Sequence, residues 1–286
     1  MSPSDAASAT GTSTGTGTAV QARPGPAAAG RRRWRLPSWS LLAALLLIWQ
    51  VLCGWYLPRI DRQFAVLLPP PSEVLLAGWE LLRSGELLMH LAASLRRELV
   101  AFAYALAAVP LGIAMGWWRG LHDMADPVVE LLRPIPPIAW IPLSILWFGV
   151  GDVQNQFIIF LGIFFPILIN TIIGVKNIDP NLIRAARCLG ANEWRMLRRV
   201  VMPAVLPQLM TGIRVGFGVG WMALVAAELV GATSGLGFLI NDARSLLRTD
   251  VIILGMLVIG LAGFGIDLLI RRLSRHLLPW SVGAQR

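Results

Sequence analysis

The sequence has little charge, few cysteines and few histidines. Only 14% of its 286 residues are charged, whereas soluble domains carry about 25%, so a soluble globular protein is excluded. The two cysteines and three histidines (Cys53, Cys188, His90, His122 and His276) are scattered, without the spacing of a disulfide or metal site. We therefore expect no metal site and no catalytic set, and a membrane enzyme is disfavoured.

The chain also lacks a nucleotide-binding motif. Its single lysine, Lys176, follows Val175, and no G-x-x-x-x-G-K-[ST] sequence occurs. That motif supplies the lysine and the backbone amides that hold nucleotide phosphates. No cofactor is expected in this chain, and energy from ATP would have to come through another polypeptide.

Long apolar segments dominate what is present. The chain is 56% hydrophobic and has 12 tryptophans, a residue that gathers at membrane interfaces. This composition predicts an all-α protein of the lipid bilayer, and it makes basic cytoplasmic loops a better explanation of the net charge of +9 than nucleic-acid binding. Six apolar segments are long enough to span a membrane, at about 39–57, 95–117, 131–150, 157–175, 206–230 and 251–270.

The N-terminal region precedes the first span. Residues 1–36 are mostly Ser, Thr, Ala, Gly and Pro, a composition that predicts a disordered tail. Basic residues before an apolar run are also typical of a signal peptide, and Leu52-Cys53-Gly54 faintly resembles a lipoprotein site. The length of the run, the lack of an A-x-A site and the large Leu52 favour an uncleaved span. Residues 72–91 predict an amphipathic helix on or outside the bilayer.

Orientation follows from the arginines and the lysine. With the N-terminus inside, 16 of the 25 basic residues lie in cytoplasmic parts and five in outer loops. Four more, Arg96, Arg97, Arg133 and Arg214, lie at span edges or within spans. The positive-inside rule therefore predicts that both termini and the segment 179–207 are cytoplasmic.

The segment 179–207 is the longest polar interval between apolar segments. Asp179 is a plausible N-cap, Gly190 is a plausible helix end, and Asn192 can cap a second helix. Pro203 and Pro207 are expected to separate that second helix from the fifth span. A helical face is expected from Leu182, Ile183, Ala186 and Leu189. The segment could dock a partner protein, or it could be a basic loop held by anionic lipid headgroups.

The same segment carries a family resemblance. Arg184-Ala185-Ala186, then Gly190, then Val200-Val201-Met202-Pro203 resembles the EAA loop of bacterial ABC importer permeases, except that Arg184 replaces the family's Glu. The resemblance implies a type I ABC importer permease fold, in which this coupling helix seats in a groove of an ATPase subunit that binds ATP and Mg. The departure at Arg184 alters the charge of that contact while keeping the shape of the loop.

Further motifs narrow the resemblance to permeases for taurine, aliphatic sulfonates and nitrate, and most closely to taurine permeases. They include Leu68–Val74, Arg133–Pro142, Ile183–Ala191, Thr211–Glu228 and Gly235–Phe238. The resemblance implies a bacterial inner-membrane importer subunit that works with two ATPase copies, a second permease copy and an extracytoplasmic binding protein. Its cargo would be taurine or an alkanesulfonate, or alternatively nitrate or another small organic anion.

A stand-alone secondary transporter is disfavoured because inverted repeats and clustered mid-membrane acids are not seen.

Residues within the spans offer candidates for the translocation path. Gly212, Gly216 and Gly220 form a small-residue stripe, either for packing within the subunit or for a dimer or gate contact. Arg214 and Glu228 share a helical face because they are fourteen residues apart. Glu228 could face a cavity or gate, or make a structural pair, whereas Arg214 is expected to reach the cytoplasmic surface or hold the coupling loop. If taurine is the cargo, Glu228 suits its ammonium, and Trp221, Ser144 or Asn170 could donate to its sulfonate.

Overall fold

The computed structural model describes residues 38–56, 59 and 67–278, so the tail expected at 1–36 lies outside the described residues. Every regular element in these ranges is a helix, which confirms the all-α prediction. Four helical stretches are long and apolar enough to cross a membrane: Glu86–Trp117, Asp152–Lys176, Glu193–Gly231 and Thr249–Leu277. A bent pair, Arg119–Leu132 with Pro137–Phe148, would make a fifth. The apolar helix Ala43–Tyr56, where the first span is expected, is shorter than these.

The elements follow one another with short connections. In chain order they are α1 (Ser38–Val51), the π-helix η1 (Leu52–Tyr56), α4 (Pro71–Arg83), α5 (Glu86–Ala105), α6 (Ala108–Trp117), α7 (Arg119–Leu132), the 3-10 helix η2 (Pro137–Trp140), α8 (Ile141–Phe148), α9 (Asp152–Lys176), α10 (Pro180–Cys188), α11 (Glu193–Met196), the π-helix η3 (Leu197–Val201), α12 (Met202–Gly231), α13 (Leu236–Ser245) and α14 (Thr249–Leu277).

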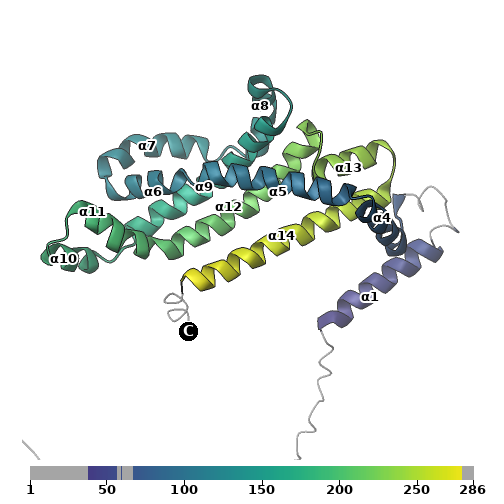
Figure 1. Ribbon diagram of the computed structural model, residues 1–286, viewed down its shortest axis with the longest axis horizontal. Coiled ribbons are helices and arrows are strands. Elements are labelled where there is room, and N and C mark those ends of the chain that lie inside the picture. Colours follow the sequence, from purple (N-terminus) through teal and green to yellow (C-terminus); the bar gives the residue numbers. More distant parts are fainter. Residues whose placement is uncertain (1–37, 57–58, 60–66, 279–286) are drawn as a thin grey trace, which may run out of the picture. The chain divides into compact units, whose positions relative to one another are not determined.

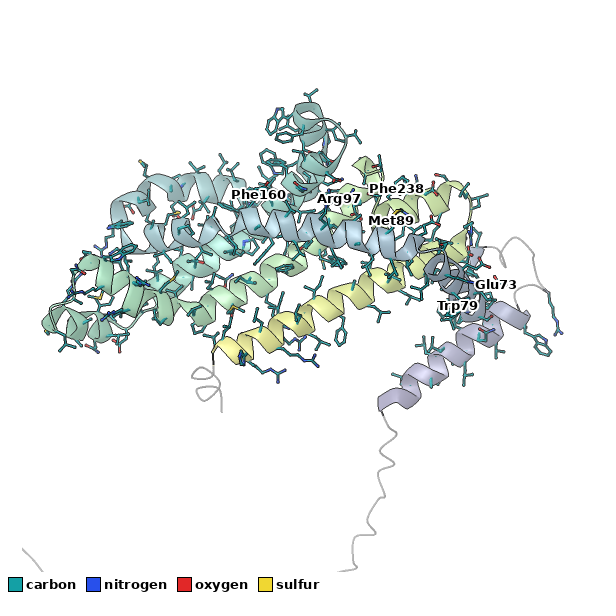
Figure 2. The ribbon with its side chains drawn as sticks, in the orientation of Figure 1. Glu73, Trp79, Met89, Arg97, Phe160 and Phe238 are labelled. Atoms are coloured by element: carbon teal, nitrogen blue, oxygen red, sulfur yellow. The ribbon has the colours of Figure 1, made fainter. Side chains whose placement is uncertain are left out.

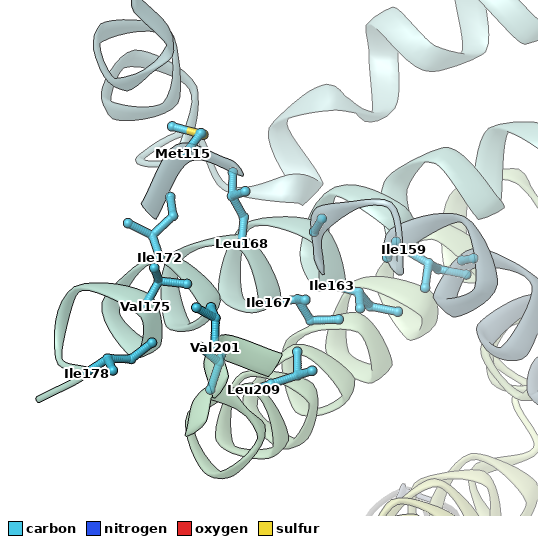
Figure 3. Close-up of a cluster of buried hydrophobic side chains, with 14 of the residues drawn as sticks. Met115, Ile159, Ile163, Ile167, Leu168, Ile172, Val175, Ile178, Val201 and Leu209 are labelled. Atoms are coloured by element: carbon cyan, nitrogen blue, oxygen red, sulfur yellow. The ribbon is translucent and has the colours of Figure 1, made fainter. Parts of the chain in front are cut away.

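Helix α9 is the centre of the bundle. Helices α5, α6 and α12 all pack on it, and α12 makes the most extensive contact. The largest core cluster includes Met115, Ile163, Ile167, Val175 and Val201, all buried (Figure 3). Figure 1 shows α10 and α11 at one end of this bundle and α13 at the other.

Glycines set the close contact between α12 and α9. A Cβ at Gly212 would lie 2.7 Å from the Asn170 Cβ, and one at Gly220 would lie 2.5 Å from the Ile163 Cγ1. At Gly216 a Cβ would lie 3.1 Å from the Ile163 carbonyl oxygen. The stripe therefore faces α9 of the same subunit, and packing within the subunit accounts for all three positions.

The second apolar segment differs from the expected span. Helix α5 begins at Glu86 rather than near residue 95, because Gly85 takes a left-handed conformation (φ 82°) and turns the chain after α4. The last residues of the expected amphipathic helix at 72–91 therefore belong to α5. The helical stretch is also interrupted between Ala105 and Ala108.

The third apolar segment is not one straight helix over 131–150. Helix α7 ends at Leu132, and the chain resumes as η2 and α8 after a bend of 83°. Pro134 and Pro136 lie in the break, and Pro137 begins η2. Because proline has no N–H to donate and clashes with the preceding turn, this run ends the helix.

The prediction that Pro203 and Pro207 separate the second cytoplasmic helix from the fifth span is wrong. The chain is helical from Glu193 through η3 and α12 to Gly231. Pro203 lies in the first turn of α12, and Pro207 lies inside it. The π-helical turn η3 widens the helix just before the two prolines. A local widening of this kind changes the backbone hydrogen-bond pattern without ending the helix.

Candidate functional site

Hydrogen bonds between residues close in the sequence fix the backbone of the segment 179–203. The Asp179 carboxylate accepts a hydrogen bond from the Asn181 N–H (2.8 Å), and the Asn192 side chain accepts one from the Arg195 N–H (2.9 Å), so both predicted caps are confirmed. Gly190 has φ 75°. Its N–H donates to the Arg187 carbonyl, and the next N–H, of Ala191, donates back to Ala186. This pair of bonds is the Schellman motif, which glycine permits.

The segment has a packed face and an open face. Met196 and Val201 are buried in the main core cluster, and Ile183 and Ala186 pack against it. Leu182 and Leu189, expected on the same face as Ile183 and Ala186, lie outside this core instead. Leu189 is 88% exposed and Leu182 is 47% exposed.

Several other residues of the segment are exposed. Trp194 is 69% exposed, and Arg184, Ala185 and Pro203 are also exposed. A Cβ at Gly190 would meet no atom within 4 Å. The open face therefore combines apolar side chains with small residues that permit close approach.

Polar contacts hold this segment to the bundle. Trp117 at the end of α6 donates from Nε1 to Glu193 (3.0 Å). Glu193 also lies 3.9 Å from the Arg187 guanidinium. Arg184 donates from Nε to the Pro180 carbonyl oxygen of its own helix (3.4 Å). The position of α10 and α11 is thus fixed from the packed side, while the open face has few internal partners.

Glu228 lies at the opposite end of the bundle, in a buried polar cluster. Its side chain is inaccessible to solvent. The Ser94 hydroxyl lies 2.8 and 2.9 Å from its two oxygens, and the Gly237 N–H donates to it at 2.9 Å. The Arg97 guanidinium completes the set at 2.8 Å. Glu228 was predicted either to face a cavity or gate or to form a structural pair. Its surroundings in this conformation are those of a structural ion pair.

Arg97 connects four parts of the chain. From α5 it contacts Glu228 of α12, Asp152 at the start of α9 (2.7 Å), and both the carbonyl and the hydroxyl of Ser234 (2.6 and 2.9 Å). Its side chain is only 3% exposed. Figure 2 labels Arg97 on α5. Since a buried charge requires partners, the two carboxylates account for the arginine at this depth.

The turn between α12 and α13 closes over the same cluster. Gly235 (φ 115°) donates its N–H to His90 Nδ1 (3.0 Å), and the Leu236 N–H donates to the Ser94 hydroxyl (2.9 Å). A Cβ at Gly235 would lie 2.2 Å from a Glu228 oxygen. Glycine is therefore required here by both conformation and space.

The other predicted path residues are separated from Glu228. Trp221 donates from Nε1 to the Ile259 carbonyl of α14 (3.2 Å), and the buried Ser144 hydroxyl donates to Ile141 within α8 (2.8 Å). Arg214 pairs with Asp267 of α14 (2.7 Å). It lines an open cavity of about 840 Å³ between α12 and α14.

Asn170 lies in a different place again. It lines a cavity of about 320 Å³ between α9, α12 and the bend before η2. Its Nδ2 donates to the Pro166 carbonyl (2.8 Å), and its Oδ1 accepts from Gln208 (3.0 Å). The five predicted path residues thus occupy several environments rather than one site. Within the described ranges, no group of three His, Cys, Asp or Glu side chains could hold a metal ion.

Sequence reasoning missed most of the buried polar cluster. His90, Ser94 and Arg97 follow one another at spacings of four and three residues, which puts them on one helical face. This regular polar face in an apolar segment was the signal that could have revealed the cluster. Asp152 and Asp267, the partners of Arg97 and Arg214, are distant in sequence and carried no such signal.

Comparison with known proteins identifies the family. A family model described as "Binding-protein-dependent transport system inner membrane component" matches residues 108–281. The chain is 41% identical over 263 residues to the taurine transport system permease protein TauC of Escherichia coli (strain K12), covering 87% of this chain and 94% of that protein. The chain belongs to this permease family.

The permease is also similar to a second transport protein and to a solved structure. It is 36% identical over 253 residues to the putative aliphatic sulfonates transport permease protein SsuC of Bacillus subtilis (strain 168), covering 88% of this chain and 90% of that protein. A solved structure of the MetNI methionine ABC transporter, in inward facing conformations, matches with a TM-score of 0.50 at 20% identity. That match covers 63% of the permease and 92% of the compared chain, which supports the importer permease fold.

Proposed function

We propose that the permease is the membrane subunit of an ATP-driven importer and that the segment 179–203 docks on a separate ATPase subunit. The observation that carries the proposal is the open face of α10 and α11, where Leu189 and Trp194 are exposed beside Ala185 and Gly190. Large apolar side chains in contact with water at a rigid surface are typical of a protein interface.

The cargo proposed is a small anionic or zwitterionic solute, with taurine or an alkanesulfonate first. Support comes from the 41% identity to a taurine permease and the 36% identity to a putative sulfonate permease. We further propose two ATPase subunits, a second copy of the permease and an extracytoplasmic binding protein as partners. The chain would lie in the bacterial inner membrane with both termini in the cytoplasm.

Docking is tested by Leu189→Glu. Because Leu189 is 88% exposed, the change removes almost no internal packing. A buried leucine contributes about 1.5–3 kcal/mol, so we expect ATPase affinity to fall roughly tenfold or more, with uptake falling in parallel. The ATPase that co-purifies with the permease, and taurine uptake by cells expressing the whole transporter, are the measurements.

The matched control is Leu246→Glu in the turn between α13 and α14. Leu246 is 65% exposed and directly follows α13, which lies at the opposite end of the bundle from α10 (Figure 1). Both variants should reach the membrane in normal amounts. Full ATPase recovery and uptake with Leu189→Glu would contradict the docking proposal.

The cargo is tested separately by deletion. A strain without the permease should lose growth on taurine as sole sulfur source and regain it when the gene is restored. Unchanged growth and unchanged taurine uptake in the deletion strain would overturn the assignment of taurine without affecting the docking result.

A further inference from the structure

A cavity lies at half the length of the two central helices. It is the cavity of about 320 Å³ that Asn170 lines, and its walls also include Phe165 of α9, Val215 and Val219 of α12, and Trp140 of η2. α9 runs from residue 152 to 176 and α12 from 202 to 231. The cavity is therefore near the middle of both helices, where transport proteins commonly bind their cargo.

Arg133 is the one charged residue in the lining of this cavity. It follows α7 at the bend of 83°. Four arginines are predicted at span edges or within spans, and three of them pair with carboxylates: Arg96 and Arg97 with Asp152, and Arg214 with Asp267. Among the described residues, no ion pair or hydrogen bond to the Arg133 side chain is found.

Arg133 is exposed in the single subunit and lies beside a cavity at the middle of α9 and α12, so its charge is open to a partner from outside the subunit. Ionisable side chains inside membrane proteins face a cavity or a partner, and they mark substrate and ion pathways. The planar guanidinium presents a fork of donors that suits the oxygens of a compact oxyanion. Trp140 and Phe165 add aromatic surface on which a short carbon chain could pack. The volume lies at the small end of the range for ligand pockets.

We propose that this cavity binds the cargo's anionic headgroup and that Arg133 is the residue that pairs with it. The expected ligand is a small organic oxyanion such as a sulfonate, with its carbon chain against Trp140 and Phe165. This inference rests on the proposed function, since it assigns to the cargo a place within the membrane subunit. The binding protein would deliver the anion, and Arg133 would hold it during passage.

The first test measures charge selectivity inside the cavity without requiring transport. Val219, which is 36% exposed, is changed to Cys in a chain whose Cys53 and Cys188 are replaced by Ala. In membranes containing the assembled transporter, the thiol is labelled by 2-sulfonatoethyl or by 2-trimethylammonioethyl methanethiosulfonate. Arg133→Met should lower the ratio of anionic to cationic labelling rates by about tenfold. Arg119→Met, at the opposite end of α7 from Arg133, should leave the ratio unchanged.

The second test measures uptake by the whole transporter. Arg133→Met should reduce taurine uptake about tenfold or more at low concentration, and Arg133→Lys should restore part of it because the charge is kept. If the labelling ratio of Arg133→Met equals that of the parent, the inference is overturned, even where uptake falls. If the parent transports taurine and Arg133→Met does so equally well, the inference also fails while the proposed function stands. If the parent transports no sulfonate, the proposed cargo fails, and the labelling ratio still decides whether the cavity favours anions.

Discussion

Replacing Arg97 by Met should destabilise the permease strongly, because the change removes the cation that Glu228 and Asp152 share and leaves Glu228 with none. Glu228 has a fully inaccessible side chain and would keep only its hydrogen bonds from Ser94 and Gly237. Asp152 would keep Arg96. Removing one member of a buried ion pair costs about 3–5 kcal/mol, and we expect a loss of folding free energy of about 4 kcal/mol.

Glu228→Gln should cost less, about 2 kcal/mol. The amide oxygen can still accept from Ser94 and Gly237, and Arg97 keeps Asp152 and Ser234. The double variant removes both charges, so its loss should be smaller than the sum of the single losses by about 2 kcal/mol. Unfolding of the detergent-solubilised permease, followed by denaturant or temperature, measures all three values.

The adjacent arginine provides a matched control. Arg96 also pairs with Asp152 at 2.7 Å, but its side chain is 70% exposed against 3% for Arg97. Arg96→Met should therefore cost no more than about 1 kcal/mol. Equal losses for Arg96→Met and Arg97→Met, or strictly additive losses for Arg97→Met and Glu228→Gln, would refute the view that burial makes this pair important.

Three other predictions concern glycines and the second ion pair. Gly220→Ala should cost about 2 kcal/mol of folding free energy, because its Cβ would lie 2.5 Å from Ile163. Gly218 on the same helix has open space around it, so Gly218→Ala should be neutral or slightly stabilising. Equal thermal stability of the two variants would contradict the packing of α12 on α9. Gly190→Ala should cost about 1–2 kcal/mol of folding free energy, because φ is positive at this position although the surrounding space is open. The variant should lower the amount of co-purified ATPase more than it lowers the amount of permease in the membrane. Normal recovery of the ATPase would show that the Schellman turn is not needed for docking. Asp267→Asn should change the thermal stability only slightly, because its two partners, Arg214 and Arg271, are both about half exposed. A thermal shift as large as that of Arg97→Met would contradict this view of an exposed ion pair.

The site was only partly predictable, because some of its contacts join residues that are close in the sequence and others join residues that are far apart. The caps at Asp179 and Asn192 and the turn at Gly190 involve residues within a few positions of one another, so local patterns were sufficient. The split between Ile183 and Leu189 was predicted incorrectly. Both are apolar, and only the position of the bundle decides which one packs and which one faces outward.

The polar cluster depends on contacts over long sequence distances. Arg97 and Glu228 are separated by 131 positions, and each alone can be read as a pore residue or as half of an ion pair. The bend after Leu132 had a clear cause in its prolines, yet its angle of 83° depends on how η2 and α8 pack against α9 and α12.

The sequence by itself determined the membrane class, the apolar segments and the local form of the segment 179–203, because hydropathy, capping and turn formation act over a few residues. Only the tertiary structure decided which charges are paired. Glycines bring α12 against α9, this approach carries Glu228 to Arg97, and Arg133 is left beside a cavity. Since electrostatic pairing depends on distance in space, it follows the packing of the helices rather than their order in the chain.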